Sequence, residues 1–358
     1  MKKKVLIVAS FLAGHGGEET VIKQFINLMA PEFKIDLLVV PAIGTQTWLN
    51  DDHVPLNRLY VTTKQTASAK FSFLLHNLNK SQPDIVICLT PKLLFNVWLI
   101  QKILRRNFRI LSWIQFTLKN KFAPKILRFL RFADGHLALT REMVADLKDL
   151  QIPATKIFLV HNPVLPQNKV IIPAKPTRFL FVGRIEFKGD KNLQELLHAL
   201  ALIEPTQNWQ LDIYGHDDSP KQQETQQCKA LIAHLHLATR VNWRGFQPQL
   251  WQNLQRADCL ILPSCSESFG MAVCEAISYG LPVVAANSAC GPVEIINNNN
   301  GFLYSSGNIQ QLSSYLTGFC QHKYQFEAEK VKKSIEPFYT DNYQQNVSQI
   351  LQHLLKEN

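Results

Sequence analysis

The sequence predicts an α/β protein made of two successive halves, each with a mostly parallel sheet. Short apolar runs alternate with helical patterns along the whole chain, which is typical of repeated strand–helix units. The length of 358 residues is that expected for two domains. Residues 165–177 carry three prolines and little periodicity, so they predict a linker between the halves.

The first half, residues 1–164, contains apolar runs that predict buried parallel strands. These runs cover residues 5–9, 35–40, 83–89, 109–114 and 134–139. Helical patterns cover 21–29, 71–79 and 140–150, and Pro91 is placed to open one more helix. Thr140 is a suitable N-cap. Residues 41–67 are polar and irregular, and predict no element.

The second half repeats the alternation over residues 178–338. Its predicted strands are 179–184, 210–215, 241–246, 258–262 and 282–286, and its predicted helices are 192–202, 222–237, 250–257 and 271–279. A last helix, 341–356, lies in a final segment of residues 339–358. The sequence therefore predicts two Rossmann-like domains.

Composition excludes several classes of protein. The chain is 46% hydrophobic and 18% charged, as in ordinary globular proteins, and no run approaches about 18 uncharged apolar residues, the length of a membrane span. The apolar run near the N-terminus is too short for a signal peptide and predicts a first strand. Seven scattered cysteines without a Cys-x2-Cys pair favour a reducing compartment over a zinc site.

The net charge of +10 belongs to the first half. Residues 1–164 hold 22 Lys+Arg and 11 Asp+Glu, a balance of +11, whereas residues 165–358 hold 16 and 17, a balance of −1. A basic half favours an anionic partner, such as a phosphorylated acceptor or an acidic membrane face. No helix-turn-helix, RNA-recognition or zinc-finger pattern is present, so we expect no nucleic acid partner.

A basic amphipathic segment lies within residues 105–132. Its apolar residues Phe122, Ile126, Phe129 and Leu130 recur at helical spacing, and between them stand the cations Lys121, Lys125, Arg128 and Arg131. One interpretation is a surface helix whose apolar stripe packs on the protein core. The other is a face that docks on an anionic membrane and brings the protein to a lipid-borne acceptor.

Two glutamates follow the apolar run 258–262. Glu267 lies in a polar loop, and Glu275 lies one turn into the next helix, so both are expected at the carboxyl end of a strand, where ligands bind in open α/β sheets. The helix amides suit a phosphate, and a carboxylate such as Glu275 can accept hydrogen bonds from the vicinal hydroxyls of a ribose. Alternatively, the pair is a solvated loop charge and a partner of the helix dipole.

Two other loops offer anion-binding groups. Gly16 and Gly17 stand between the first strand and its helix, where backbone amides can approach an anion, although a bare turn needs no ligand. Arg184 with Lys188 or Lys191 follows the strand 179–184 and can clamp phosphate oxygens. We favour Lys191 because it opens the next helix, and a plain surface pair of cations is the alternative.

These motifs together resemble those of a known family. Glu267-x7-Glu275, with Ser-Phe-Gly-Met after the first Glu and Ala-Ile-Ser-Tyr-Gly-Leu-Pro-Val-Val after the second, is similar to the retaining glycosyltransferases of family 4. The likeness implies a GT-B fold, two Rossmann-like domains facing across a cleft. It covers nearly the whole second half, and in the first half it is looser. The segment Ser-Trp-Ile-Gln-Phe around Gln115 looks similar to bacterial transferases that extend lipopolysaccharide cores or surface polysaccharides, including the 1,6-galactosyltransferases.

The resemblance implies a role for each candidate residue. The amides of Phe269, Gly270 and Met271, with Arg184 and Lys191, would stabilise the leaving diphosphate without a metal or other cofactor. Glu275 would hold the ribose, Glu267 the donor sugar, and Gly16 and Gly17 would lie over the diphosphate. Many relatives carry histidine at the position of Gln115, and a glutamine can bind a sugar hydroxyl but cannot shuttle a proton.

We therefore expect a retaining, metal-independent hexosyltransferase that uses a nucleotide sugar, UDP-linked, and a glycan or glycolipid acceptor. Its expected location is the cytoplasm or the inner face of the membrane, as a peripheral protein. Two alternatives remain open: a nucleotide-sugar epimerase or hydrolase on the same scaffold, and a non-catalytic basic binding module of the same fold.

Overall fold

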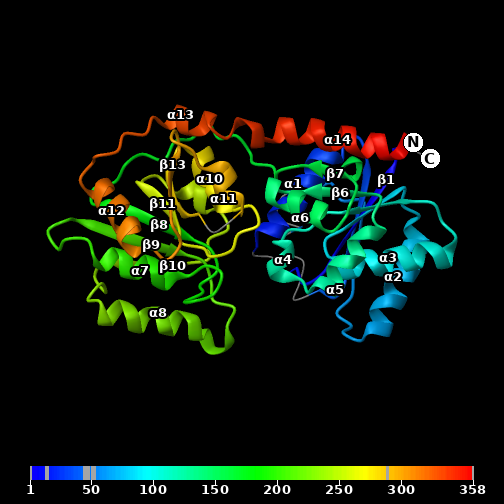
Figure 1. The fold of residues 1–358 in the computed structure, drawn as a ribbon, viewed down its shortest axis with the longest axis horizontal. Coiled ribbons are helices and arrows are strands. Elements are labelled where there is room, and N and C mark those ends of the chain that lie inside the picture. Colours follow the sequence, from blue (N-terminus) through cyan, green and yellow to red (C-terminus); the bar gives the residue numbers. More distant parts are fainter. Residues whose placement is uncertain (1, 13–15, 43–48, 50–53, 288–289, 357–358) are drawn as a thin grey trace. The chain divides into compact units, whose positions relative to one another are not determined.

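The computed structural model describes residues 2–12, 16–42, 49, 54–287 and 290–356. The chain forms two compact units, shown in Figure 1. The first comprises Met1–Pro163 together with Thr340–Asn358, and the second comprises Val164–Tyr339. Gly14 and His15, which belong to the glycine-rich loop of the sequence, lie outside the described residues.

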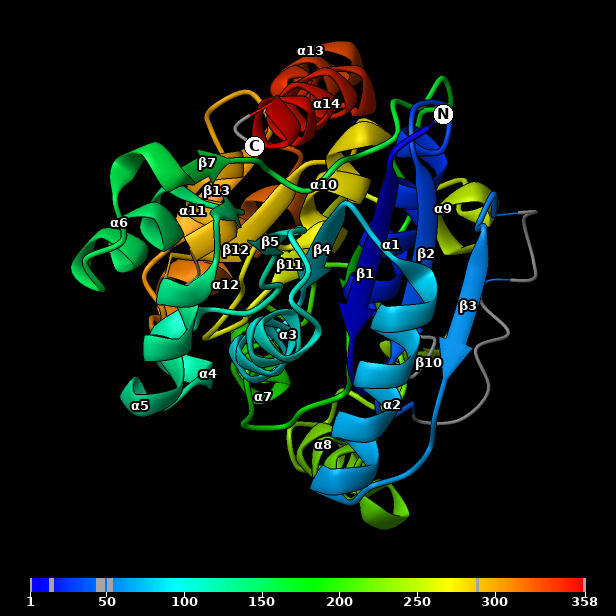
Figure 2. The same cartoon turned by 90° about the vertical axis from the view of Figure 1, so that its right-hand side faces the viewer.

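The first unit contains a seven-stranded parallel sheet in the order β3-β2-β1-β4-β5-β6-β7. Figure 2 shows its strands together with α2 and α3. The chain starts in the middle of this sheet, adds β2 and β3 on one side and then returns to add the others on the opposite side. The strands are β1 (Lys4–Ala9), β2 (Lys34–Val39), β3 (Arg58–Val61), β4 (Ile85–Cys88), β5 (Arg109–Ser112), β6 (Gly135–Ala138) and β7 (Ile157–Leu159).

The helices of the first unit follow the strands. They are α1 (Gly17–Met29), α2 (Ala67–Ser81), α3 (Pro91–Leu104), α4 (Leu118–Lys121), α5 (Pro124–Leu127), η2 (Arg128–Phe132), α6 (Arg141–Asp149), η3 (Ala154–Lys156) and α14 (Thr340–Lys356). Helix α3 packs on β4 and β5, and α14 packs on α1. Thr140 caps α6 by accepting a hydrogen bond from the amide of Met143, and Pro91 stands in the first turn of α3, as the sequence predicts.

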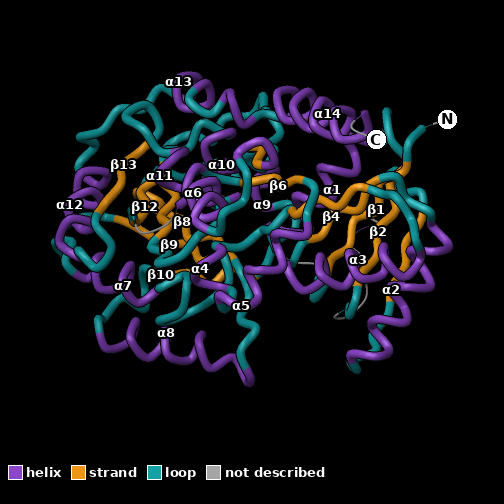
Figure 3. The backbone as a smooth tube through the Cα atoms, turned by 45° about the vertical axis from the view of Figure 1, so that its right-hand side comes forward, coloured by secondary structure: helices purple, strands orange, loops and turns teal. Residues whose placement is uncertain are grey.

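The second unit contains a six-stranded parallel sheet in the order β10-β9-β8-β11-β12-β13. In Figure 3 the strands are orange and the surrounding helices purple. The strands are β8 (Thr177–Val182), β9 (Trp209–Tyr214), β10 (Val241–Gly245), β11 (Cys259–Leu262), β12 (Val283–Ala286) and β13 (Gly301–Tyr304). Strands β11 and β12 are buried along their whole length, because in a doubly wound fold helices cover both faces of the sheet.

The helices of the second unit lie on both faces of its sheet, with α7 and α8 on one side and α10, α11 and α13 on the other (Figure 1). Helix α7 packs on α12, and α10 packs on α11 and α13. The helices are α7 (Leu193–Ala201), η4 (Pro220–Gln222), α8 (Gln223–His234), α9 (Leu250–Asn253), α10 (Met271–Ser278), α11 (Cys290–Ile295), α12 (Ile309–Cys320), α13 (Ala328–Lys333) and η5 (Glu336–Phe338).

The predicted α/β class with parallel sheets is confirmed, and three strands are added to it. The sequence analysis does not include β3 or β7, which are the two edge strands of the first sheet, or β13, which is an edge strand of the second. Three of the four residues of β3 are exposed, and no residue of β7 is fully buried. Edge strands with exposed faces do not need a continuous apolar run, so the periodicity that reveals buried strands is missing.

The basic amphipathic segment is not one helix, and that prediction is wrong. The chain forms three short pieces there, α4, α5 and η2. Proline cannot donate the backbone hydrogen bond of a continuing helix, and it forces the preceding residue, Ala123, into the extended region (φ −62°, ψ 146°). The break therefore falls at Pro124. None of the described helices is both long and apolar enough to span a membrane.

Candidate active site

The candidate site lies where the strand order of the second sheet reverses. Strand β8 comes first in the chain, β9 and β10 extend the sheet to one side, and β11 then starts the other side. The loops that leave β8 and β11 at their carboxyl ends therefore diverge from neighbouring strands. Such a switch point is the usual ligand site of an open α/β sheet. The β8 loop carries Arg184 and Lys191, and the β11 loop carries Glu267.

The structure brings Lys191 and Glu267 together. The Nζ atom of Lys191 forms an ion pair and hydrogen bond with Oε1 of Glu267. Both side chains are largely shielded from solvent, with 16% and 13% of their surface exposed. Ser264 Oγ also donates to Oε1 of Glu267, at 3.4 Å. This pairing distinguishes Lys191 from Lys188, which is exposed and lies 6.0 Å from the centroid of the Phe187 ring.

Backbone and carboxylate contacts hold the β8 loop in place. The amide of Cys265 donates to the carbonyl of Asp190 at 2.8 Å, which ties the two loops to each other. Glu186 accepts from the amide of Lys191 at 3.0 Å and pairs with Nη2 of Arg184 at 3.2 Å. Half of the Arg184 side chain is exposed. Glu186 thus holds the Arg184 guanidinium and the Lys191 backbone, and Arg184 remains accessible to an anion.

The loop after β11 is shaped by two glycines. Gly270, which precedes α10, has φ +88°. Other residues adopt this backbone conformation only with strain. Gly291 lies so close to Phe269 that a Cβ there would stand 1.9 Å from its carbonyl oxygen. Phe269 is buried and meets Phe338 edge to face at 5.9 Å between ring centroids. Met271 is the first residue of α10, where a backbone amide has no acceptor within the helix.

Glu275 is held by a residue that the sequence analysis missed. Trp251 Nε1 donates a hydrogen bond to Oε2 of Glu275 at 2.8 Å. Burial raises the pKa of Glu275, and the hydrogen bond from Trp251 opposes that shift. The pKa of Tyr279, just beyond α10, is raised by burial and by the negative charge of Glu275. No motif or spacing links position 251 to position 275, because helices α9 and α10 meet only in the folded chain.

The remaining candidates lie in the first unit. Gly16 precedes α1 and Gly17 is its first residue, and the amide of Gly16 donates to Oε2 of Glu19 at 3.0 Å. That amide therefore already has an acceptor. Gln115 is buried just beyond β5, and its Oε1 accepts from Nδ2 of Asn162 at 2.8 Å. The side chain of Gln115 is thus oriented by Asn162. Among the described residues, no group of three or more His, Cys, Asp and Glu side chains is placed to bind a metal ion.

Fold and site together define the class. The chain consists of two doubly wound parallel α/β units of the GT-B type, with a cationic, glycine-shaped loop pair at the switch point of the second. Residues 167–335, which lie within the second unit, match the family model described as glycosyl transferases group 1. The second unit is therefore similar to the glycosyl transferases of group 1.

Full-length comparisons extend this likeness to the whole chain. It is 29% identical to a lipopolysaccharide 1,6-galactosyltransferase of Salmonella typhimurium, over 96% of this chain and 97% of the relative. It is 27% identical to the enzyme of the same name from Escherichia coli K12, over 97% and 98%. The solved apo structure of the lipopolysaccharide outer core galactosyltransferase WaaB superimposes with a TM-score of 0.80 at 27% identity, covering 96% of this chain and 98% of that one.

A more distant structure shows the same fold. HepE of Anabaena, solved in complex with UDP-glucose, has a TM-score of 0.82 over 98% of this chain and 99% of its own. At 20% identity this likeness concerns the fold alone.

Proposed function

We propose that this protein transfers a hexose from a UDP-linked sugar to a glycan or glycolipid acceptor in the synthesis of lipopolysaccharide or a surface polysaccharide. The observation that carries the proposal is the pairing of Lys191 with Glu267 at the switch point of a unit that is similar to the glycosyl transferases of group 1. The full-length relatives, which are named as lipopolysaccharide galactosyltransferases, favour galactose as the first sugar to test.

Two cations support a reaction that does not depend on a metal. When the bond between the anomeric carbon and the phosphate oxygen breaks, negative charge builds on the leaving diphosphate. Arg184 and Lys191, with the amides at the start of α10, are placed to stabilise that charge. Lys191 would then contact both the diphosphate and Glu267. Most of this work is done by groups already oriented before the donor binds, which is what makes electrostatic stabilisation effective.

The sugar is assigned to Glu267. A carboxylate can accept hydrogen bonds from two sugar hydroxyls, and the ion pair with Lys191 fixes where it points. We infer that the acceptor hydroxyl attacks the anomeric carbon from the face that the diphosphate leaves. The new bond joins the acceptor oxygen to the anomeric carbon, the hydroxyl proton passes to a leaving phosphate oxygen, and UDP departs. This sequence retains the anomeric configuration.

We place the protein in the cytoplasm, on the inner face of the membrane. None of the seven cysteines, all of which lie among the described residues, forms a disulfide, and this supports a reducing compartment. The acceptor is either a soluble glycan or one carried by a lipid. In the second case, the exposed cations of the first unit would hold the protein at an anionic surface.

The test of the proposed function is a panel of nucleotide sugars in a thermal-shift assay, followed by transfer with the best donor. A donor that binds only the folded protein raises the melting temperature. We expect UDP-galactose or another UDP-hexose to give the largest shift and to yield a glycosylated acceptor. Release of free sugar without an acceptor would indicate a hydrolase, and the absence of any shift would favour a non-catalytic module.

A further inference from the structure

Trp251 and Glu275 are joined by a directional hydrogen bond and not by packing alone. They lie 24 residues apart in the chain, on α9 and α10, and the indole Nε1 stands 2.8 Å from Oε2 of the carboxylate. An indole nitrogen can only donate a hydrogen bond. The contact therefore engages one oxygen of the carboxylate and leaves Oε1 as the acceptor for another donor.

A second contact fixes the direction of the indole. The ring of Trp251 stacks on that of Tyr279, with centroids 6.1 Å apart and planes inclined by 21°. Tyr279 is 5% exposed and directly follows α10, so it presents a rigid surface to the tryptophan. A tryptophan side chain has only two rotatable bonds. Stacking on one side and hydrogen bonding at the nitrogen therefore leave it little freedom.

The acceptor of this hydrogen bond, Glu275, is a partly buried carboxylate. Glu275 is half-buried on the helix that begins at the site, and burial disfavours its ionised form. A hydrogen bond from the indole stabilises that ionised form. The same bond restrains the carboxylate to one rotamer. Both effects prepare Glu275 to accept hydrogen bonds from a pair of neighbouring hydroxyl groups.

We propose that Trp251 is a positioning residue that orients Glu275 toward the ribose hydroxyls of the donor nucleotide. This inference rests on the proposed function, because it needs a nucleotide at this site. It adds to that function the residue that orients Glu275, the group by which the protein would distinguish a ribonucleotide from a 2′-deoxyribonucleotide. Trp251 itself does not contact the nucleotide in this account, so its influence is confined to the hydroxyl groups that Glu275 binds.

The experiment measures the affinities of UDP and 2′-deoxy-UDP by calorimetry for the full-length protein and three variants. Trp251→Phe keeps an aromatic ring on Tyr279 and removes the N–H donor. Glu275→Ala removes the carboxylate. Trp243→Phe is the matched control, because it also removes an indole from the second unit, but that ring lies under Lys229, 5.7 Å from Nζ.

We expect the wild-type protein to prefer UDP over 2′-deoxy-UDP by about tenfold or more, since a hydrogen bond to a charged group is lost with the hydroxyl. Glu275→Ala should abolish this preference. Trp251→Phe should reduce it to about threefold or less, with the affinity for 2′-deoxy-UDP within about twofold of wild type, because only one group's orientation is lost. The control should behave as wild type. Trp251→Leu, which also lacks the N–H, carries the same expectation if the phenylalanine variant does not fold.

Three results would overturn the inference, and each has a different meaning. If Trp251→Phe keeps the full preference for UDP while Glu275→Ala loses it, Trp251 does not position the carboxylate. If Glu275→Ala also keeps the preference, the ribose lies elsewhere. If UDP does not bind the wild-type protein, the proposed function fails, and the inference with it.

Discussion

Lys191 and Glu267 lie 76 residues apart in the chain and form an ion pair at the carboxyl ends of two neighbouring strands. Each residue comes from a loop that leaves the switch point of the second sheet. A buried or partly buried pair of opposite charges is costly to break from one side, because the remaining charge is left without a partner. The pair therefore ties the proposed anion-binding group to the proposed sugar-binding group, and its two members can be tested separately.

Lys191→Ala is expected to lower the rate of sugar transfer by about 10²- to 10³-fold, the scale of losing one preorganised group that stabilises a developing anion. Steady-state kinetics with a UDP-hexose measures this. Lys188→Ala is the matched control, because Lys188 is exposed on the same loop, and its rate should remain within about twofold of wild type. If the two variants exchange these outcomes, the diphosphate is bound by Lys188.

Arg184→Ala is expected to lower kcat/KM on the order of a hundredfold. This corresponds to a loss of a few kcal/mol of transition-state stabilisation. Arg184 pairs with Glu186 in the free protein, so Arg184→Lys should recover only part of the loss, because lysine lacks the planar fork that matches phosphate oxygens. The two variants are compared in the same transfer assay. A wild-type rate in Arg184→Ala would remove this residue from the site.

Chelation is expected to leave the reaction rate unchanged, because in the proposed mechanism two cationic side chains and helix amides would stabilise the charge that a metal ion stabilises in other transferases. The measurement is the initial rate after treatment with EDTA and exchange into metal-free buffer. A loss of activity that Mg²⁺ or Mn²⁺ restores would contradict the proposed mechanism.

The first unit carries a buried histidine that predicts how stability depends on pH. His136 is 1% exposed, Ser112 Oγ lies 2.7 Å from its Nδ1, and burial with the nearby charge of Lys156 lowers its pKa to about 4. In the unfolded chain the pKa is about 6.5. The unfolded state thus binds more protons between these values, so stability should fall as the pH drops from 6.5 toward 4.

The pKa shift of this histidine alone is expected to make the free energy of unfolding about 2 kcal/mol lower at pH 5 than at pH 8. Urea unfolding at the two pH values measures the difference. His136→Gln should show a pH dependence smaller by about that amount, whereas His76→Gln, which removes an exposed histidine from α2, should not change it. Equal pH dependence in wild type and His136→Gln would show that the histidine is not buried in its neutral form.

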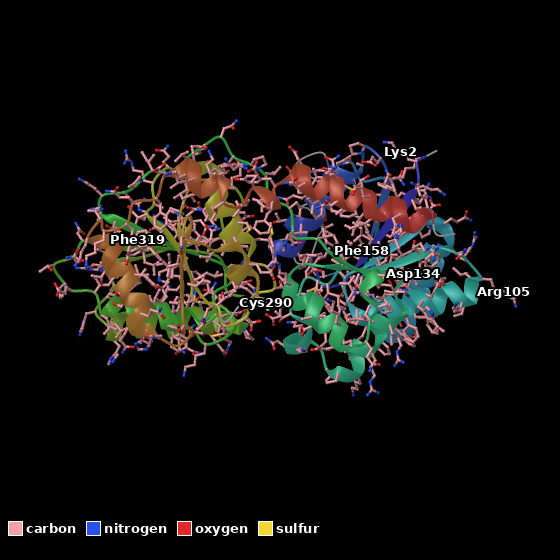
Figure 4. All side chains as sticks on the ribbon, turned by 45° about the horizontal axis from the view of Figure 1, so that its top comes forward. Lys2, Arg105, Asp134, Phe158, Cys290 and Phe319 are labelled. Carbon is pink, nitrogen blue, oxygen red and sulfur yellow. The ribbon has the colours of Figure 1, made fainter. Side chains whose placement is uncertain are left out.

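The basic segment of the first unit presents its cations to solvent, whereas its aromatic rings pack within the unit. Phe129 and Phe132 stack on Phe95 and Trp98 of α3, with centroids 4.4 Å apart for Phe95 and Phe129 and 4.2 Å apart for Trp98 and Phe132. These rings are therefore engaged within the unit. Seven cations within residues 105–132 are exposed: Arg105, Arg106, Lys119, Lys121, Lys125, Arg128 and Arg131. Figure 4 labels Arg105, which follows α3.

We expect this basic surface to bind anionic vesicles through charge, with about 1 kcal/mol for each cation that reaches the surface. Co-sedimentation with phosphatidylglycerol vesicles should therefore be strong at low salt and weak at high salt. Lys125→Glu combined with Arg128→Glu should abolish binding. Lys175→Glu combined with Lys323→Glu, exposed positions of the second unit, should not. Failure of the wild-type protein to bind at low salt would exclude the membrane partner.

Much of the fold could be predicted from the sequence because buried parallel strands have a local signature. Strand β11 is a continuous apolar run, and the helix α10 that follows it ends close to Gly280, which has φ +76°. The strand and the end of the helix can therefore both be predicted from the local sequence. The predicted helix over residues 250–257 is shorter in the structure, where α9 ends at Asn253. Two residues of the segment that follows, Gln255 and Ala257, instead form backbone hydrogen bonds with Ile172.

The site could be predicted only in part, because its geometry depends on contacts between distant residues. The spacing after Arg184 admits both Lys188 and Lys191, and the choice depends on which lysine meets Glu267, a contact made only when β8 and β11 lie side by side. The same holds for Trp251 and Glu275. A sequence pattern can indicate which residue types a site needs, but not which side chain orients another.

We propose that the second unit holds a sugar nucleotide through Lys191, Arg184 and Glu275. A crystal structure of the protein with bound UDP is the most direct test of this assignment. We expect the diphosphate to lie within hydrogen-bonding distance of Lys191 Nζ and the Arg184 guanidinium, and a ribose hydroxyl to bind Oε1 of Glu275. A nucleotide bound away from the switch point between β8 and β11 would contradict it.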